Sequence, residues 1–330
     1  MENKVKITEN IYQMQIPIPD NPLEMINSYL IKTNEGSILV DTGWNTDEAF
    51  TSLCSQMKSH GVSFSDLKYI FMSHIHPDHY GLVGRIEKFT DAKLIIHEHD
   101  KAILNSRYIQ TDNLVDEMTE WLKFNGVPEA EQTSFSHASL KMLGYVDVAL
   151  PDIIVSGGEK ISLGDNTFEV IWSPGHSPGH ICFFEEKKRL LIAGDHILEK
   201  ISPNISMNNP TTNNPLVDYM NSLEEMKKLD VEFVLPGHGR VFSNYRERID
   251  QLLIHHEKRL LEMLTYFEKG PATAYQIAID TKWYLPWDDL PMFSKRVAVT
   301  ETLAHLELLI DRCALSKKEQ AGIIYYFLPE

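Results

Sequence analysis

The sequence is poor in cysteine, in basic residues and in long apolar runs. Its 330 residues include three cysteines, Cys54, Cys182 and Cys313. An odd number of widely spaced cysteines argues against a disulfide framework and favours reduced thiols. No stretch approaches the roughly 18–20 apolar residues that a bilayer span requires, and residues 1–6 lead into no apolar signal core. We therefore expect a cytoplasmic chain with no membrane partner and no standard secretion signal.

The excess of acidic residues narrows the range of partners. Lys and Arg number 31 and Asp and Glu number 47, a formal net charge of −16. Non-specific binding to nucleic acid or to an anionic membrane needs a positive surface. Residues 245–330 hold 11 Lys and Arg against 13 Asp and Glu, so this tail is slightly acidic as well. We expect a small-molecule substrate and no nucleic-acid partner, while a homodimer and a local basic groove stay compatible with this charge.

Alternating strand and helix patterns fill most of the first 244 residues, and an apolar content of 43% is ordinary for a globular protein. Residues 28–33 and 37–41 are β-type runs joined by Asn34-Glu35-Gly36, which predicts a hairpin. An apolar strand is expected at 67–72, and helical spacing predicts one helix over 80–89. Further strands are expected at 93–97, 160–163, 168–172, 181–184, 190–193 and 231–235, with a polar loop at 202–215 and a helix at 217–229.

Two segments have a helical texture instead. Between about residues 100 and 150, Leu114, Met118, Trp121 and Leu122 recur at helical spacing, which predicts a helical insertion beside the sheet. Further on, helices are expected at 248–267, 273–279 and 296–311, with a strand at 323–327. Three helices and a strand in such a short tail are typical of a winged-helix-like fold. We predict a catalytic domain of residues 1–244 and a winged-helix-like domain of residues 245–330.

A cluster of metal-binding residue types follows the predicted strand at 67–72. Three imidazoles and one carboxylate occur within six residues in Ser73-His74-Ile75-His76-Pro77-Asp78-His79. These groups are ligands suited to zinc, iron or manganese. The histidines at 74 and 76 can grip one metal from an extended loop, while the Asp-His pair turns toward a second. Gly81 then allows a tight turn where the chain leaves this loop.

Three further ligand candidates lie where a predicted strand ends. His176 follows Ser173-Pro174-Gly175, Asp195 follows Ala193-Gly194, and His238 follows Pro236-Gly237. Side chains at the ends of neighbouring strands converge at one edge of a sheet. One such residue alone would more often be structural, but their shared placement beside the first cluster predicts that each binds metal.

This order of motifs resembles that of the metallo-β-lactamase superfamily. His-x-His-x-Asp-His is followed by Gly-His, Gly-Asp and Gly-His, and Val40-Asp41-Thr42-Gly43 matches the early Asp motif. The resemblance covers roughly residues 8–245 and implies an α+β fold, a four-layer αββα sandwich of two mixed sheets with helices outside. It implies a first metal on His74, His76 and His176, a second on Asp78, His79 and His238, Asp195 bridging both, and Asp41 orienting the ligand loop.

The expected cofactors are two divalent metal ions, with zinc first and iron or manganese as alternatives. Metals about 3.5–4 Å apart can share a water and lower its pKa toward neutrality, so that hydroxide attacks the substrate while Asp78 carries protons. His180 resembles a position of glyoxalase II-like thioesterases and lactonases, so it is a candidate contact to a ligand or to the substrate, or else a packing residue. Tyr80 is a candidate for lining the pocket, and Asp41 alternatively caps the turn before Gly43.

Several branches of the superfamily are disfavoured. Exported β-lactamases carry a signal, and many have Cys where Asp195 stands. Flavodiiron reductases usually have Glu where His76 stands, and they add a flavodoxin domain. Glyoxalase II would need a basic cluster in the tail, and the β-CASP nucleases carry a large inserted domain. The combination with a short helical tail resembles a broad group of bacterial hydrolases and a eukaryotic endoribonuclease.

Three functional hypotheses follow. The first is a hydrolase of small acyl compounds, a thioester, ester or lactone, with the helical insertion as lid. The second is a phosphodiesterase acting on RNA or a nucleotide, and the third is a metal-containing binding or effector protein with weak turnover. Met118, Trp121, Leu122 and Phe124 of the insertion favour the first, because an apolar lid suits an acyl substrate. A cleft lined by Lys and Arg would favour RNA.

Overall fold

The computed structural model describes residues 5–19, 21–208 and 214–329. Residues 209–213 of the predicted polar loop, and residues 1–4 of the start in which no signal core is expected, lie outside the described residues. Twelve of the fourteen described strands form a seven-stranded sheet in chain order and a five-stranded sheet in the order β12-β11-β10-β9-β8, and the other two pair in the tail. The first sheet consists of β1 (Val5–Thr8), β2 (Ile11–Pro17), β3 (Met25–Thr33), β4 (Gly36–Val40), β5 (Leu67–Phe71), β6 (Lys93–His97) and β7 (Ile153–Val155). The second consists of β8 (Lys160–Leu163), β9 (Asn166–Trp172), β10 (Ile181–Glu185), β11 (Leu190–Gly194) and β12 (Phe233–Pro236).

Both sheets are mixed, and they pack face to face. Strands β1 to β4 pair antiparallel and β4 to β7 pair parallel, whereas β8 to β11 pair antiparallel and β12 joins β11 in parallel. Phe71 of the first sheet stacks on Phe183 of the second, with ring centroids 4.6 Å apart, and meets Phe168 edge-on. Strand β10 reads Ile-Cys-Phe-Phe-Glu and is buried throughout, as expected for a strand covered on both faces.

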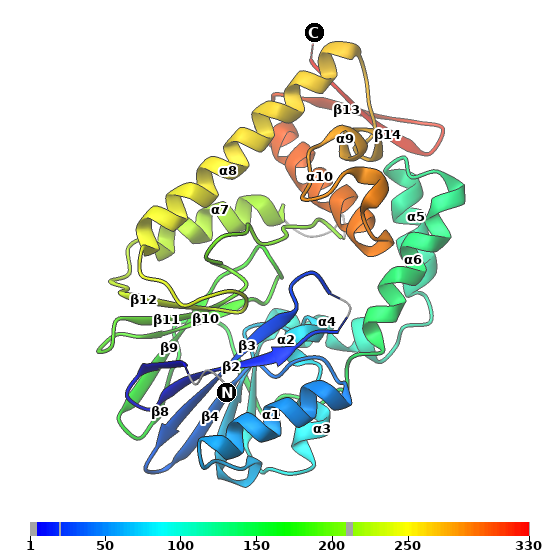
Figure 1. Cartoon of the computed structure of the whole chain (residues 1–330). Helices are drawn as coiled ribbons and strands as arrows, with labels where there is room; N and C mark the ends of the chain where they lie inside the picture. Colours follow the sequence, from blue (N-terminus) through cyan, green and yellow to red (C-terminus); the bar gives the residue numbers. More distant parts are fainter. Residues whose placement is uncertain (1–4, 20, 209–213, 330) are drawn as a thin grey trace.

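Helices cover the outer face of each sheet, so that the four layers predicted as αββα are confirmed (Figure 1). Helices α1 (Asp47–Ser59), α2 (Pro77–Tyr80) and α3 (Val83–Glu87) pack on the first sheet, and α7 (Pro215–Met226) and α8 (Tyr245–Tyr266) pack on the second. Helix α1 is not among the predicted helices, although its buried Ala49, Leu53 and Met57 recur every four residues. The side chain of Thr46 caps its N-terminus by accepting a hydrogen bond from the Ala49 N–H.

The predicted helical insertion and tail are both present. The insertion holds α4 (Glu98–Tyr108), α5 (Leu114–Phe124) and α6 (Glu129–Leu143), and the tail continues after α8 with α9 (Ala274–Asp280), α10 (Met292–Asp311), β13 (Ser316–Gln320) and β14 (Ile323–Phe327). Short 3₁₀ helices occur at Phe64–Asp66, Phe267–Lys269 and Trp287–Asp289. The likeness of the tail to a winged helix stays a prediction. Among the described helices, none combines the length and the apolar character that crossing a membrane requires.

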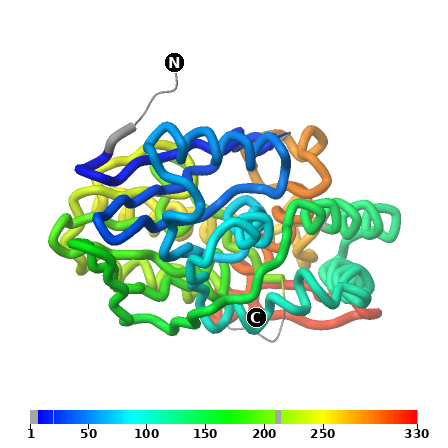
Figure 2. Tube along the Cα trace, turned by 90° about the horizontal axis from the view of Figure 1, so that it is seen from below, coloured from blue at the N-terminus to red at the C-terminus, as the bar shows by residue number. Residues whose placement is uncertain are grey.

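The insertion and the tail pack against each other (Figure 2). Leu122 and Phe135 of the insertion share an apolar cluster with Tyr275, Ala278 and Val299 of the tail. The middle of helix α10, from Ala298 to Leu309, is mostly buried, because its other faces contact α7 and α8 over the second sheet. The tail is therefore an integral wall of the molecule.

Some predicted boundaries are wrong. The helix predicted over residues 80–89 is shorter, Val83–Glu87, and the separate helix α2 ends at Tyr80 before it. Three chain segments converge at Gly81 between the two helices. A Cβ atom there would lie 2.4 Å from the Tyr145 carbonyl oxygen and 2.8 Å from that of Gly43. Helix α10 begins at Met292, directly after Pro291, rather than at residue 296. Strands β1, β2, β7 and β13 are additional, and β13 contains no apolar residue that could have predicted it.

Candidate functional site

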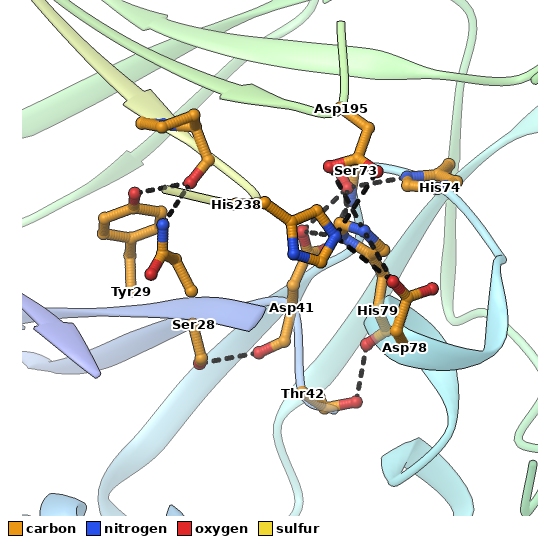
Figure 3. Close-up of polar contacts among 12 residues, drawn as sticks. Ser28, Tyr29, Asp41, Thr42, Ser73, His74, Asp78, His79, Asp195 and His238 are labelled. Carbon is orange, nitrogen blue, oxygen red and sulfur yellow. Dashed lines mark hydrogen bonds and ion pairs between the residues drawn. The ribbon is translucent and has the colours of Figure 1, made fainter. Parts of the chain in front are cut away.

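Seven side chains from both sheets meet at one edge of the sandwich. Four follow β5, and the others follow β9, β11 and β12. Figure 3 shows five of them pointing toward one another: His74, Asp78, His79, Asp195 and His238. The ligand atoms lie within 4.8 Å of one another in each of three groups: His74, His76 and His176; Asp78, His79 and His238; and His74, His79 and Asp195. The structure therefore brings together all seven residues that the sequence analysis selects. We call them the candidate metal centre.

Asp195 lies between the first two groups. One carboxylate oxygen, Oδ1, is 3.5 Å from Nε2 of His79. The other oxygen, Oδ2, is 3.5 Å from Nε2 of His238 and 3.7 Å from Nε2 of His176. The Nε2 atoms of His74 and His176 are 3.2 Å apart, and Asp78 Oδ2 lies 3.2 Å from His238 Nε2.

The outer ring nitrogens of four of these histidines are held by neighbouring groups. The Nδ1 partners are Ser73 Oγ for His74 (3.0 Å), Asp41 Oδ2 for His79 (2.7 Å), the Asn204 carbonyl for His176 (2.8 Å) and the Met25 carbonyl for His238 (2.9 Å). A carbonyl or carboxylate partner makes Nδ1 the donor. The lone pair of Nε2 is then left facing the centre, which is the tautomer that a metal ligand needs.

Asp41 organises the loop that carries the histidines. Its Oδ1 accepts a hydrogen bond from the Ser73 N–H (2.8 Å), and its Oδ2 accepts from the Ser73 hydroxyl (2.7 Å) and from His79. Its own carbonyl accepts from the Ser28 hydroxyl (2.7 Å), as Figure 3 shows. Asp41 has a φ of 57°, a strained conformation for a residue other than glycine. In this conformation the carboxylate lies behind the ligand loop, in the orienting position that the resemblance implies.

The electrostatics of the centre suit a cation. Burial, and then the neighbouring imidazoles, hold the pKa of His74 well below its ordinary value. Burial also lowers the pKa of His79, but the carboxylates of Asp195, Asp41 and Asp78 outweigh it and hold this pKa well above its ordinary value. Within the described part of the chain, the buried atoms His79 Nε2, His238 Nε2 and Asp195 Oδ1 have no hydrogen-bond partner. Because an unsatisfied buried polar atom costs about 1–3 kcal/mol, these clusters fit, and could bind, metal ions.

His180 lies behind Asp195 and is fully buried. Its Nε2 accepts a hydrogen bond from the Asp195 backbone N–H (3.1 Å), and its Nδ1 bonds the Ser173 hydroxyl (2.8 Å). Of the roles considered for this residue, contact with the substrate is excluded by its burial. His180 positions the chain that carries Asp195.

The prediction that Tyr80 lines the pocket is wrong. Its side chain is fully buried among the apolar residues beneath the first sheet. Its hydroxyl donates to the Ala149 carbonyl and accepts from the Ala149 N–H. Helix α2 begins at Pro77, so that Asp78 faces the cleft while Tyr80 is turned into the core.

Asp100 is a structural contributor to the site that the sequence analysis does not identify. Its fully buried carboxylate accepts hydrogen bonds from the N–H groups of Ile75 (2.9 Å) and Gly179 (2.9 Å), and so ties two ligand loops together. A Cβ atom on Gly179 would lie 2.4 Å from the Asp100 nitrogen, so a larger residue does not fit there. Burial raises the pKa of Asp100 to about 6, against the opposing effect of its donors. From sequence, Asp100 is indistinguishable from an ordinary acidic residue in the first turn of α4.

A cleft of about 1940 Å³ opens above the candidate metal centre. Its floor includes His76, Asp78, His176, Asp195 and His238. The insertion forms one wall and α10 with the preceding loop forms another. All four apolar residues expected in the lid line this cleft: Met118, Trp121, Leu122 and Phe124.

Comparisons with known proteins agree with this architecture. Residues 21–238 match the family model of the metallo-beta-lactamase superfamily. The chain is 26% identical to "Probable metallo-hydrolase YqjP" of Bacillus subtilis, over 97% of this chain and 98% of that protein. It is 27% identical to "Beta-lactamase-like protein 2 homolog" of Caenorhabditis elegans, over 79% of this chain and 73% of that protein.

A solved structure extends the likeness to the tail. The metallo-beta-lactamase family protein TTHA1429 of Thermus thermophilus superposes with a TM-score of 0.84 and 30% identity, over 98% of this chain and all of that chain. The chain therefore belongs to the metallo-beta-lactamase superfamily and is an enzyme of the metallo-hydrolase class.

Proposed function

We propose that this enzyme uses two divalent metal ions to hydrolyse a small acyl substrate, a thioester, ester or lactone. His74, His76 and His176 would hold the first ion, Asp78, His79 and His238 the second, and Asp195 both. Ions bound there supply Lewis acidity and lower the pKa of a shared water toward neutrality. The mixed nitrogen and oxygen donors fit zinc, and also iron or manganese. The observation that carries the proposal is the pair of ligand groups, joined by Asp195, beneath a cleft with an apolar wall.

Asp78 is the residue that we assign to proton transfer. Its carboxylate lies on the floor of the cleft, and 18% of its side chain is exposed. It is therefore accessible to a substrate, unlike the fully buried His79 beside it. A carboxylate in this position can take a proton from the attacking water and deliver it to the leaving group.

The apolar wall favours an acyl substrate over a phosphodiester. Met118 and Trp121 of the insertion line the cleft together with Met292 and Phe293 of α10. Ligand clefts of this kind bury most of an apolar substrate and exclude water around the reacting group. Burial of most of α10 also supports this preference, because a recognition helix needs an exposed face to enter a DNA groove.

One observation favours phosphodiester hydrolysis as a second candidate. Seven Lys and Arg side chains line the cleft, and phosphates are commonly bound by such groups. The three cysteines are free thiols, which supports a reducing, cytoplasmic compartment for either activity.

The test is a screen of the purified, zinc-loaded full chain. The substrates are acyl-CoA thioesters, lactones, bis(p-nitrophenyl) phosphate and single-stranded RNA. We expect the highest kcat/KM on a thioester or lactone, whereas faster cleavage of a phosphodiester would replace the acyl proposal. Metal analysis should find two ions per chain, with nitrogen ligands at roughly 2.0–2.1 Å if the metal is zinc. A stoichiometry of one would contradict the two-metal mechanism.

A further inference from the structure

We propose that the cleft contains an oxyanion-binding subsite between Arg107 of α4 and Arg296 of α10, which receives a carboxylate or phosphate group of the substrate. The inference rests on the proposed function, because it narrows the acyl substrate to one that carries a negative charge.

The charge of the cleft is opposite to that of the chain. The whole chain carries a formal charge of −16. Apart from Asp78 and Asp195 of the metal centre, the acidic residues that line the cleft are Glu117, Glu120 and Glu301. The basic residues that line it are Arg107, Lys141, Lys200, Arg248, Arg259, Lys282 and Arg296. A concave surface of one sign concentrates ligands of the opposite sign.

Two of these basic side chains already form hydrogen bonds that stabilise the fold. The guanidinium of Arg248 donates to the carbonyls of Leu198 (2.7 Å) and Ile201 (2.8 Å). Arg259 donates to the Lys282 carbonyl (3.0 Å). These donors are engaged in tying α8 to its neighbouring loops and are not free for a ligand.

Arg296 and Arg107 differ from these two. Among the described residues, Arg296 makes one side-chain hydrogen bond, from Nη1 to Asn208 Oδ1 (3.0 Å), while its buried Nε has no partner there. The guanidinium of Arg107 lies 5.5 Å from the ring centroid of Tyr108, shares a side-chain hydrogen bond with this residue and is attracted by the buried Asp100. Within residues 5–19, 21–208 and 214–329, neither arginine forms an ion pair with an acidic side chain. Both guanidinium groups therefore keep donors for a ligand in the cleft.

The unpaired charges are unfavourable in the absence of a ligand. Burial and, to a smaller extent, the positive charge of Arg107 together lower the pKa of Arg296 to about 10. Arg296 is still charged at neutral pH, and it is repelled by Arg107 in the cleft that both side chains line. A carboxylate or phosphate would neutralise both, and the planar guanidinium fork binds such oxyanions with two parallel hydrogen bonds.

The subsite adjoins the first group of ligands. Tyr108, next to Arg107, donates its hydroxyl to the Ile75 carbonyl (2.6 Å), between His74 and His76. On the other side, Arg296 donates to Asn208, four residues after Asn204, whose carbonyl orients His176. A negative group between the arginines would thus place the neighbouring bond of the substrate over the metal centre.

The negative group that binds between the arginines can belong to the acyl part or to the thiol part of a thioester. Three substrates distinguish these two possibilities. Butyryl-N-acetylcysteamine is uncharged, succinyl-N-acetylcysteamine carries a carboxylate in the acyl part, and butyryl-CoA carries phosphates in the thiol part. The zinc-loaded full chain should prefer one of the charged substrates over the uncharged one. R107Q and R296Q should each lower kcat/KM for that substrate about ten- to a hundredfold more than for the uncharged one. The matched control R312Q, at the exposed end of α10, should leave all three values unchanged.

A binding measurement separates failure of the inference from failure of the proposed function. Calorimetry with the non-hydrolysable S-butyl-CoA and S-(3-carboxypropyl)-N-acetylcysteamine should give tighter binding of one of them to the wild type than to R296Q, even if no thioester is turned over. Absence of turnover together with this binding would refute only the acyl hydrolase.

Two results would overturn the inference itself. The first is an equal loss on all three substrates in R296Q, which would make Arg296 a positioning residue for the loop that orients His176. The second is wild-type turnover and binding that do not distinguish charged from uncharged ligands. The midpoint of thermal unfolding of R296Q should equal or exceed that of the wild type, since a partly buried cation without an acidic partner is removed. If R296Q does not fold, R107Q alone decides the outcome.

Discussion

The floor and the walls of the cleft are built on different principles. On the floor, nearly every polar atom that does not face the centre is held by a neighbour, as the Nδ1 partners of His79, His176 and His238 illustrate. On the walls, apolar side chains lie beside cations such as Arg296 that have few partners. The floor comes from strand ends and one contiguous motif, whereas the walls come from the insertion and the tail.

This difference suggests that the floor determines the type of reaction and that the walls determine which substrate is selected. On the floor, hydrogen bonds from neighbouring groups hold the candidate metal ligands in one orientation. This suits a single type of reaction, because a small misplacement of the reacting groups lowers the rate strongly. Walls assembled from loops and helices outside the sandwich can change without disturbing the floor. The following predictions test whether the two regions are as separate as this comparison suggests.

The largest effect is expected on the floor, at Asp195. Asp195→Asn keeps the shape of the side chain but removes the charge shared by the two ligand groups. We expect kcat to fall by several orders of magnitude and the metal content to drop, while the circular dichroism spectrum is preserved. Asp78→Asn should also lower kcat strongly.

The matched control is Asp230→Asn, the same change on an exposed surface carboxylate, which should leave kcat unchanged. Unchanged turnover in Asp195→Asn would remove this residue from the mechanism.

The next prediction tests whether the tail, which forms one wall of the cleft, is stabilised by packing on the sandwich. Leu260 and Leu261 are neighbours on α8, but Leu260 is 1% exposed in the core over the second sheet and Leu261 is 64% exposed. Leu260→Ala should lower the free energy of unfolding by about 2–5 kcal/mol, because it leaves a cavity. Leu261→Ala should change it by less than about 0.5 kcal/mol. Denaturant unfolding measures both, and similar values would show that the tail does not share the core of the sandwich.

A smaller effect is expected from the groups that orient the ligands. Ser73→Ala removes the hydroxyl that donates to Asp41 and contacts Nδ1 of His74. We expect zinc affinity to fall about ten- to a hundredfold, as is usual when an outer partner of a ligand is lost. Chelator competition measures this affinity. The exposed Ser65→Ala is the control, and an equal loss in both variants would contradict the role of Ser73.

The smallest effect is expected from Glu301, an acidic residue of α10 that lines the cleft. Burial raises the pKa of Glu301 to about 7, above the value of about 4.3 expected for an unfolded chain. The protonated form is therefore favoured by folding, and this contribution to stability is present below about pH 4 and lost as the pH rises through 7. Glu301→Gln should raise the thermal midpoint relative to the wild type at pH 8, and by less at pH 5. A larger gain at pH 5 than at pH 8 would contradict this assignment.

The sequence analysis succeeds where geometry is local or periodic. The histidine loop after β5 occupies seven consecutive residues, so its spacing already restricts which side chains can share a metal. His176, Asp195 and His238 are identifiable because each follows an apolar strand, and strand ends share one edge of a sheet. The same reasoning fails for Tyr80, because the direction of a side chain at a helix start depends on where that helix begins.

The amino-acid sequence by itself therefore determined the superfamily, the seven residues of the candidate metal centre and the presence of a helical insertion and tail. Only the tertiary structure decided that Asp100 ties Ile75 to Gly179, and that Arg107 and Arg296 line one cleft. The physical reason is that these relations join segments far apart in the chain. Their relative placement is set by packing between the insertion, the tail and the sandwich, and no local pattern of residues encodes it.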